Sequence, residues 1–153
     1  MVSSPHALAS QAGLRVLQDG GNAADGAIAV AAALSVLYPH MTGLGGDAFF
    51  LYYDASGGSV DAYNGSGTAA LLATADFYLS KLQPHVPERG PLAALTVPGT
   101  VDAWFALHAK HASLEMRRLL EPAIGYAQDG APIARSLADA LALHREMLRR
   151  DEG

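Results

Sequence analysis

The stretch Asn64-Gly65-Ser66-Gly67 has residue types suited to contacting a ligand. Amide and hydroxyl groups can donate and accept hydrogen bonds. Glycines at the end of a strand let the backbone come very close to a bound molecule. A plain turn that closes the strand has the same composition. The residues alone leave both interpretations open, with Asn64, Ser66 and Gly67 as candidate binding residues.

Two further segments have residues that could bind an anion. Gly43-Leu44-Gly45-Gly46-Asp47 lacks the Lys-Ser/Thr of a phosphate loop, and a predicted helix rather than a strand precedes it. We therefore predict a tight turn there. Thr100 follows Pro98-Gly99 at the start of a predicted helix, where its hydroxyl could contact a substrate anion. Capping of the helix by that hydroxyl is the favoured interpretation.

Metal and cofactor sites find little support in the sequence. His108 and His111 are three residues apart on a predicted helix, but neither a Glu-x-x-His pairing nor an acidic partner stands beside them. We predict no metal and no cofactor. The absence of Cys excludes disulfides, thiolate ligands and a Cys nucleophile within these residues.

Composition narrows the class of protein. The 153 residues carry a formal net charge of −5, and no basic stripe with interleaved aromatics is present, so we expect no nucleic-acid partner. The longest apolar stretch, 27–38, is too short to span a bilayer. No signal peptide is visible. A cytoplasmic location is the default, and a periplasmic or secreted one follows if the native N-terminus is truncated.

Periodicity and breakers place the candidate residues on an α+β framework. Asn22 and Asp25 resemble a capping box at the start of an apolar helix. Three strands make a poor sheet, so part of the sheet is expected elsewhere. The predicted helices cover 5–19, 23–37, 71–81, a segment from residue 100, 116–128 and 134–150; the strands cover 48–53, 59–63 and 93–97.

Two long stretches resemble one family. The segment "LASQAGLRVLQDGGNAADGAIAVAAALSVLYPHMTGLGGDAFFLYYD" is similar to the start of the γ-glutamyltranspeptidase large subunit, and "LTVPGTVDAWFALHAKHASLEMRRLLEPAIGYAQDGAPI" is similar to a later part of it. The resemblance runs in order from about residue 2 to about residue 135. The pattern around residue 64 is closest to the acylase-like branch.

The resemblance implies a fold and an activity. The fold is the αββα sandwich of N-terminal nucleophile hydrolases, of which residues 1–153 would form a single incomplete domain, the N-terminal portion of the large subunit. A precursor in that family cleaves itself, and the new N-terminal Thr of the small subunit is the nucleophile. The substrates are γ-glutamyl or related acyl amides such as glutathione, and the acceptor is water or an amine.

This chain departs from the family pattern in two respects. Its threonines are not surrounded by the residues that flank the family's nucleophile, so we expect no catalytic residue in this chain. We also expect these residues alone to be inactive. The expected partners are the missing remainder of the large subunit and the small subunit. The Arg that holds the substrate's α-carboxylate aligns with Ser66, and the following Glu aligns with Gly67. This predicts altered acyl specificity, with Ser66, Gly67 and Asn64 as substrate-binding residues. A non-catalytic fragment or degenerate paralogue that acts only as a folded or partner-binding unit is the alternative.

Overall fold

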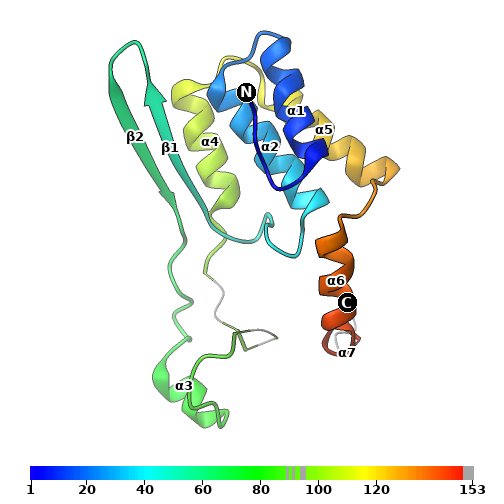
Figure 1. Cartoon of the computed structure of the whole chain (residues 1–153). Helices are drawn as coiled ribbons and strands as arrows, with labels where there is room; N and C mark the ends of the chain where they lie inside the picture. The colour runs from blue at the N-terminus through cyan, green and yellow to red at the C-terminus, as the bar shows by residue number, and fades with distance from the viewer. Residues whose placement is uncertain (89, 91, 94–95, 150–153) are drawn as a thin grey trace.

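The computed structural model describes residues 1–88, 90, 92–93 and 96–149. A group of helices lies beside a long β-hairpin, and α3 and the pair α6–α7 extend away from this body (Figure 1). The α+β class predicted from the sequence is confirmed. The elements are α1 (Ala7–Gln18), α2 (Ala23–Leu37), β1 (Ala48–Asp54), β2 (Ser59–Gly65), α3 (Ala75–Ser80), α4 (Thr100–His111), α5 (Met116–Asp129), α6 (Arg135–Leu143) and α7 (Arg145–Leu148).

Helix α2 is the centre of the helical group. It packs against α1, α5 and α4, as expected for a helix that is apolar on nearly every face. Gly13 of α1 allows the close crossing with α2, because a Cβ there would lie 2.5 Å from Val30 Cγ2. Ile28 of α2, Leu107 of α4 and Leu119 of α5 are among the largest fully buried side chains. The core therefore consists mainly of contacts between α2 and its neighbours.

The start of α2 is a capping box, as predicted. Asn22 Oδ1 accepts from the amides of Ala24 and Asp25 at 2.9 and 3.2 Å, and Asp25 Oδ2 accepts from the Asn22 amide at 2.8 Å. Asp25 is fully buried. Its carboxylate also accepts from the Ser113 hydroxyl at 2.7 Å and from the amides of Ser113 and Leu114 at 3.1 Å. One side chain thus caps α2 and holds the segment between α4 and α5.

The hairpin is antiparallel, with Ala48 opposite Gly65 and Asp54 opposite Ser59. Its inner face is half-buried against α4, and its outer face is exposed, with Phe49 at 66 % and Leu51 at 81 % of full exposure. These are the only two strands in the described part of the chain. An exposed apolar sheet face on a two-stranded hairpin needs a covering layer.

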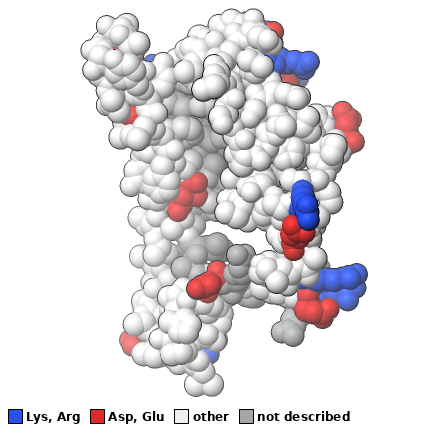
Figure 2. All heavy atoms as spheres, viewed as in Figure 1, with Lys and Arg blue, Asp and Glu red and all other residues white. Residues whose placement is uncertain are grey.

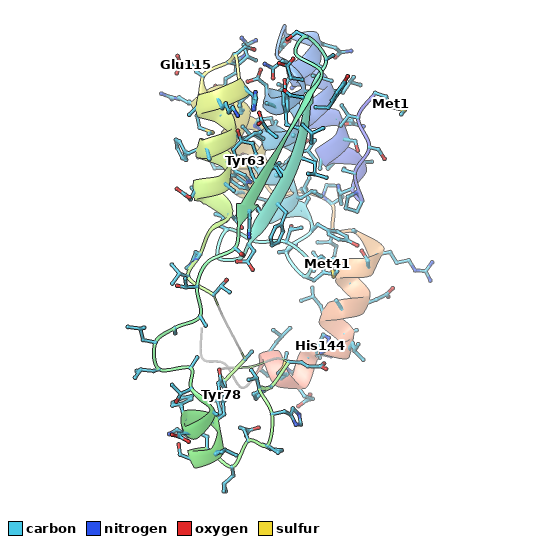
Figure 3. The ribbon with its side chains drawn as sticks, turned by 90° about the vertical axis from the view of Figure 1, so that its left-hand side faces the viewer. Met1, Met41, Tyr63, Tyr78, Glu115 and His144 are labelled. Atoms are coloured by element: carbon cyan, nitrogen blue, oxygen red, sulfur yellow. The ribbon has the colours of Figure 1, made fainter. Side chains whose placement is uncertain are left out.

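Polar and aromatic contacts join the hairpin to α4. Asp61 Oδ2 of β2 lies 2.8 Å from Lys110 Nζ and 2.9 Å from His111 Nε2. The hydrogen bond from Lys110 is the largest cause that lowers the pKa of Asp61, and burial opposes it. The His111 ring stacks on Tyr52 at a centroid distance of 4.0 Å. Figure 3 shows Tyr63 on the side of the hairpin that faces α4.

Three predicted elements differ from the observed ones. The helix predicted over 71–81 is limited to α3, where Thr74 Oγ1 accepts from the Phe77 amide and sets the first turn. The helix predicted over 134–150 is divided at His144, which has φ −103° and ψ 11°; residue 150 lies outside the described residues. The strand predicted over 93–97 lies partly outside them, and its described end forms an isolated bridge between Thr96 and Ala69.

Candidate functional site

Three segments that are distant in sequence meet at one end of the hairpin: 43–47 before β1, 64–68 at the end of β2, and 96–100 before α4. We call this meeting point the loop junction. The Gly46 carbonyl accepts from the amides of Gly99 and Thr100, both at 3.0 Å. The Val97 amide donates to the Thr68 carbonyl at 2.9 Å. Backbone bonds therefore link the third segment to each of the other two.

Glycines at the loop junction are explained by contacts within the chain. A Cβ on Gly67 would lie 1.7 Å from the Val97 carbonyl oxygen, and one on Gly99 would lie 2.1 Å from the Gly65 carbonyl oxygen. Real Cβ atoms do not approach that closely, so only glycine fits these positions. The close approach expected at Gly67 is thus an approach to residues 97–99.

Asn64 and Ser66 form a local turn on the exposed side of the junction. Asn64 Oδ1 accepts from the Ser66 amide at 3.0 Å and from the Ser66 hydroxyl at 2.7 Å. Asn64 and Ser66 are both exposed. Since the hydroxyl hydrogen is used within the turn, Ser66 Oγ presents lone pairs to an incoming group. Both interpretations of the stretch, turn and pocket wall, are compatible with this geometry.

A cavity of about 600 Å³ borders the loop junction. Its size falls within the range of small-molecule sites, about 300–1,000 Å³. The lining comes from α2, the glycine-rich loop, the start of β1 and the start of α4; it includes Thr42, Gly46, Asp47, Phe49, Thr100 and Trp104. Asn64, Ser66 and Gly67 are not among the residues that line this cavity.

The predicted role of Thr100 is wrong. Helix α4 has Gly99 as its N-cap residue and no side-chain cap, and Thr100 is the first helical residue. Its hydroxyl is buried and has no hydrogen-bond partner among the described residues. A capping Thr100 would accept from the amides two and three residues later, but the helix starts one residue earlier, where the Gly99 carbonyl accepts from the Ala103 amide, and Gly46 from another segment holds this start through the amides of Gly99 and Thr100.

Asp47 is a residue of the junction that the sequence did not single out. Its Oδ1 accepts from Thr96 Oγ1 at 2.6 Å and from the Gly67 amide at 3.3 Å. These partners lie 20 and 49 residues away along the chain. The sequence does show that Asp47 is an acidic residue between a glycine-rich loop and a predicted strand. It does not show which residues Asp47 would bind.

The two helical histidines have separate partners. His108 Nε2 lies 2.8 Å from the Leu114 carbonyl oxygen, and His111 faces Asp61 and Tyr52. Among the residues that the structure describes, no group of three potential metal-ligating side chains is found.

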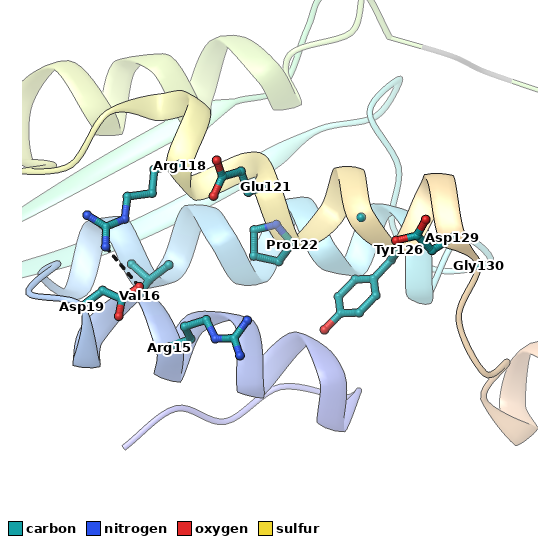
Figure 4. A pocket seen from close by; sticks show the side chains of 10 residues that line it. Arg15, Val16, Asp19, Arg118, Glu121, Pro122, Tyr126, Asp129 and Gly130 are labelled. Carbon is teal, nitrogen blue, oxygen red and sulfur yellow. Dashed lines mark ion pairs between the residues drawn. The ribbon is translucent and has the colours of Figure 1, made fainter.

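A second cleft, of about 480 Å³, lies between α1 and α5. Figure 4 shows Arg15, Tyr126 and Asp129 around it, and an ion pair of 3.2 Å between Arg118 and Asp19 at one end. No hairpin residue lines this cleft. In the view of Figure 2, charged side chains are scattered over the surface and do not form a single patch.

Comparison with known proteins identifies the family. The model of the γ-glutamyltranspeptidase family matches residues 9–153. The chain belongs to the γ-glutamyltranspeptidase family. Its backbone is similar to the crystal structure of Helicobacter pylori γ-glutamyltranspeptidase, with a TM-score of 0.91 and 35 % identity over 99 % of this chain and 44 % of that one. The expected fold, part of that of N-terminal nucleophile hydrolases, is confirmed by this likeness.

Curated members of the γ-glutamyltranspeptidase family are similar in sequence. The glutathione hydrolase-like YwrD proenzyme of Bacillus subtilis is 51 % identical over 88 % of this chain. The oxamate amidohydrolase proenzyme of Klebsiella pneumoniae is 47 % identical over all of it. The chain spans 25 % and 29 % of the lengths of these two relatives. Among the described residues, no helix has the length and hydropathy needed to cross a membrane.

The tight packing at the loop junction leads to a first prediction. Replacing Gly67 by Ala forces the 64–68 turn away from residues 97–99, and we expect a loss of about 2 kcal/mol of stability, typical of overpacking. Urea unfolding of the protein that contains this chain measures the loss. Gly43→Ala is the matched control, because a Cβ there meets no atom within 4 Å. Equal stability of the two variants would contradict the packing argument.

Proposed function

We propose that this chain is the N-terminal part of a self-processing amide hydrolase or acyltransferase that acts on γ-glutamyl or related acyl amides. The match of the γ-glutamyltranspeptidase family to residues 9–153 is the observation that supports this most. In this proposal the nucleophile is an N-terminal Thr outside the 153 residues, and these residues alone are inactive. The remaining parts of the large and small subunits are the partners of the chain.

The proposed substrate contacts are Asn64, Ser66 and Gly67. Their position at the exposed end of the hairpin supports this assignment; they do not line the cavity of about 600 Å³, but Asp47, which accepts from the Gly67 amide, does. The family's Arg would place a positive charge where Ser66 places a neutral hydroxyl. A carboxylate held there would lose two charge-assisted hydrogen bonds. We infer that the acyl group recognised at this point is neutral, or that its charge is held elsewhere.

The relatives vary in the acyl amides that their names specify. A glutathione hydrolase-like protein and an oxamate amidohydrolase are both similar in sequence to this chain. A cephalosporin acylase from Bacillus halodurans is similar in structure, with a TM-score of 0.83 and 36 % identity. Amide hydrolysis is the chemistry common to these names, and this supports a proposal that fixes the reaction type and leaves the acyl group to experiment.

Expression of the whole protein tests the proposal. We expect the precursor to separate into two polypeptides, seen by gel electrophoresis, and the processed protein to hydrolyse an acyl amide in a panel that includes glutathione, glutaryl amides and oxamate. Residues 1–153 expressed alone should hydrolyse none of them. Hydrolysis by the short chain, or a whole protein that cleaves no amide in the panel, would contradict the proposal.

A further inference from the structure

We propose that Asp47 is a positioning residue of the candidate site: its carboxylate holds the 64–68 turn against residues 96–99 and so sets where Ser66 is presented. This inference rests on the proposed function, because it gives the turn a role in substrate binding. Nothing in the family comparison assigns a role to Asp47.

The contacts of Asp47 are its first support. One oxygen, Oδ1, accepts from Thr96 Oγ1 at 2.6 Å and from the Gly67 amide at 3.3 Å. Hydrogen bonds to an ionised acceptor are stronger than those between neutral groups. The Gly67 amide directly follows Ser66 in the chain. A single atom therefore connects the candidate binding turn to the segment that leads into α4.

The position of Asp47 between fixed elements is the second support. The preceding residue, Gly46, accepts from the amides of Gly99 and Thr100, and the following residue, Ala48, begins β1 opposite Gly65. The backbone of Asp47 is thus held on both sides, which fixes the point from which its exposed side chain reaches Thr96 and Gly67. Precise placement of a binding turn requires that the residue supporting it is itself attached to fixed elements.

The turn is attached at several points, and Asp47 is the one that holds the Gly67 amide; Asn64 and Gly65 pair with Phe49 and Ala48 of β1. Asn64 and Ser66 bond to each other, which shapes the turn but does not anchor it. The Gly67 backbone packs closely against Val97, and the Gly65 backbone packs against Ala48, Gly99 and Ala103. The bond from the Val97 amide to the Thr68 carbonyl anchors the far end. Asp47 supplies the anchor at Gly67 itself.

The test uses the whole protein and three variants: Asp47→Ala, Asp47→Asn and Thr96→Val. Hydrogen–deuterium exchange followed by mass spectrometry reports on peptides that contain residues 64–68. We expect Asp47→Ala to raise the exchange rate of these amides about tenfold, since an amide that loses its partner opens more often. Asp47→Asn keeps an acceptor oxygen and should restore most of the protection. Thr96→Val leaves the Gly67 bond in place and should have a smaller effect.

Steady-state kinetics on the best acyl amide substrate provides the second readout. We expect Asp47→Ala to raise KM about tenfold with kcat changed by less than about threefold, because a misplaced binding wall weakens binding without removing a reacting group. Asp47→Asn should recover most of the wild-type KM. Equal losses of kcat and kcat/KM, with no recovery in Asp47→Asn, would overturn the positioning role.

Asp54→Ala is the matched control. Asp54 ends β1 at the opposite end of the hairpin, where its Oδ1 accepts from the Ser56 amide and hydroxyl at 2.9 and 2.6 Å. The Asp54→Ala substitution removes a carboxylate from a turn outside the loop junction, so KM should stay at the wild-type value. Unchanged exchange at residues 64–68 in Asp47→Ala overturns the inference whatever the activity. If the wild-type protein cleaves no amide, the proposed function fails, while exchange still decides whether Asp47 holds the turn.

Discussion

Replacement of Asp25 by Ala is expected to lower the stability of the protein by about 3 kcal/mol, since four partly buried donors lose one shared acceptor and each costs up to about 1 kcal/mol. The carboxylate accepts from the Asn22 amide, from the Ser113 amide and hydroxyl, and from the Leu114 amide. Asp25 is fully buried, but Ser113 is exposed and the hydrogen bonds are partly buried, so water replaces the lost acceptor only in part. The loss should appear in urea unfolding of the protein that contains this chain.

Two further variants separate the tertiary part of this effect from the helix cap. Ser113→Ala removes one donor and its bond, and should cost about 1 kcal/mol. Asp102→Asn is the matched control: Asp102 is an exposed acid in the first turn of α4, and its loss should cost at most about 1 kcal/mol. If Asp25→Ala costs no more than Asp102→Asn, the buried network does not have the role described.

The Asp25 carboxylate also predicts how the stability of the protein depends on pH. Burial by itself raises the pKa of Asp25, but the hydrogen bonds from Asn22, Ser113 and Leu114 together outweigh it, and the pKa is lowered from the usual 3.8. A carboxyl group with a lower pKa in the folded state stabilises the protein above its unfolded pKa. That contribution is lost as the pH falls through the folded pKa. The stability difference between wild type and Asp25→Asn should therefore decrease below about pH 4.

Replacement of Ser66 by Arg is expected to shift the acyl preference of the whole protein toward γ-glutamyl amides by about 100-fold in kcat/KM. The reason is a bidentate pair with the α-carboxylate, worth about 3 kcal/mol as two charge-assisted hydrogen bonds. Ser66 is exposed at the tip of its turn, so a longer side chain meets no packed neighbour in the described structure. Competition between glutathione and a neutral acyl amide measures the shift.

Neighbouring substitutions define how specific the Ser66 effect is. Ser66→Lys supplies charge without the planar fork and should give a smaller shift. Ser66→Ala should leave the preference close to that of the wild type. The family's full Arg-Glu pair is not expected to work here, because any side chain at Gly67 meets the Val97 carbonyl. An unchanged preference in Ser66→Arg would show that residue 66 does not face the acyl carboxylate.

Much of the fold could be predicted because local signals agree with the final structure. Helix α2 is apolar on nearly all sides and begins with a capping box. The hairpin follows from the apolar run of β1, a turn, and the alternating residues of β2. The less regular segments were predicted poorly. The helix expected over 71–81 begins only after Thr74, since weak periodicity does not determine where a helix starts.

The sequence by itself determined the family, the α+β class and the cap of α2, because these depend on residues that are close along the chain or on a long ordered pattern. Only the tertiary structure decided why Gly67 is glycine, why Thr100 does not cap α4, and what Asp25 and Asp47 bind. The physical reason is the same in each case. The deciding partner, Val97, Gly46, Ser113, Thr96 or Gly67, is at least 20 residues away along the chain. No local rule predicts which distant group a residue will contact.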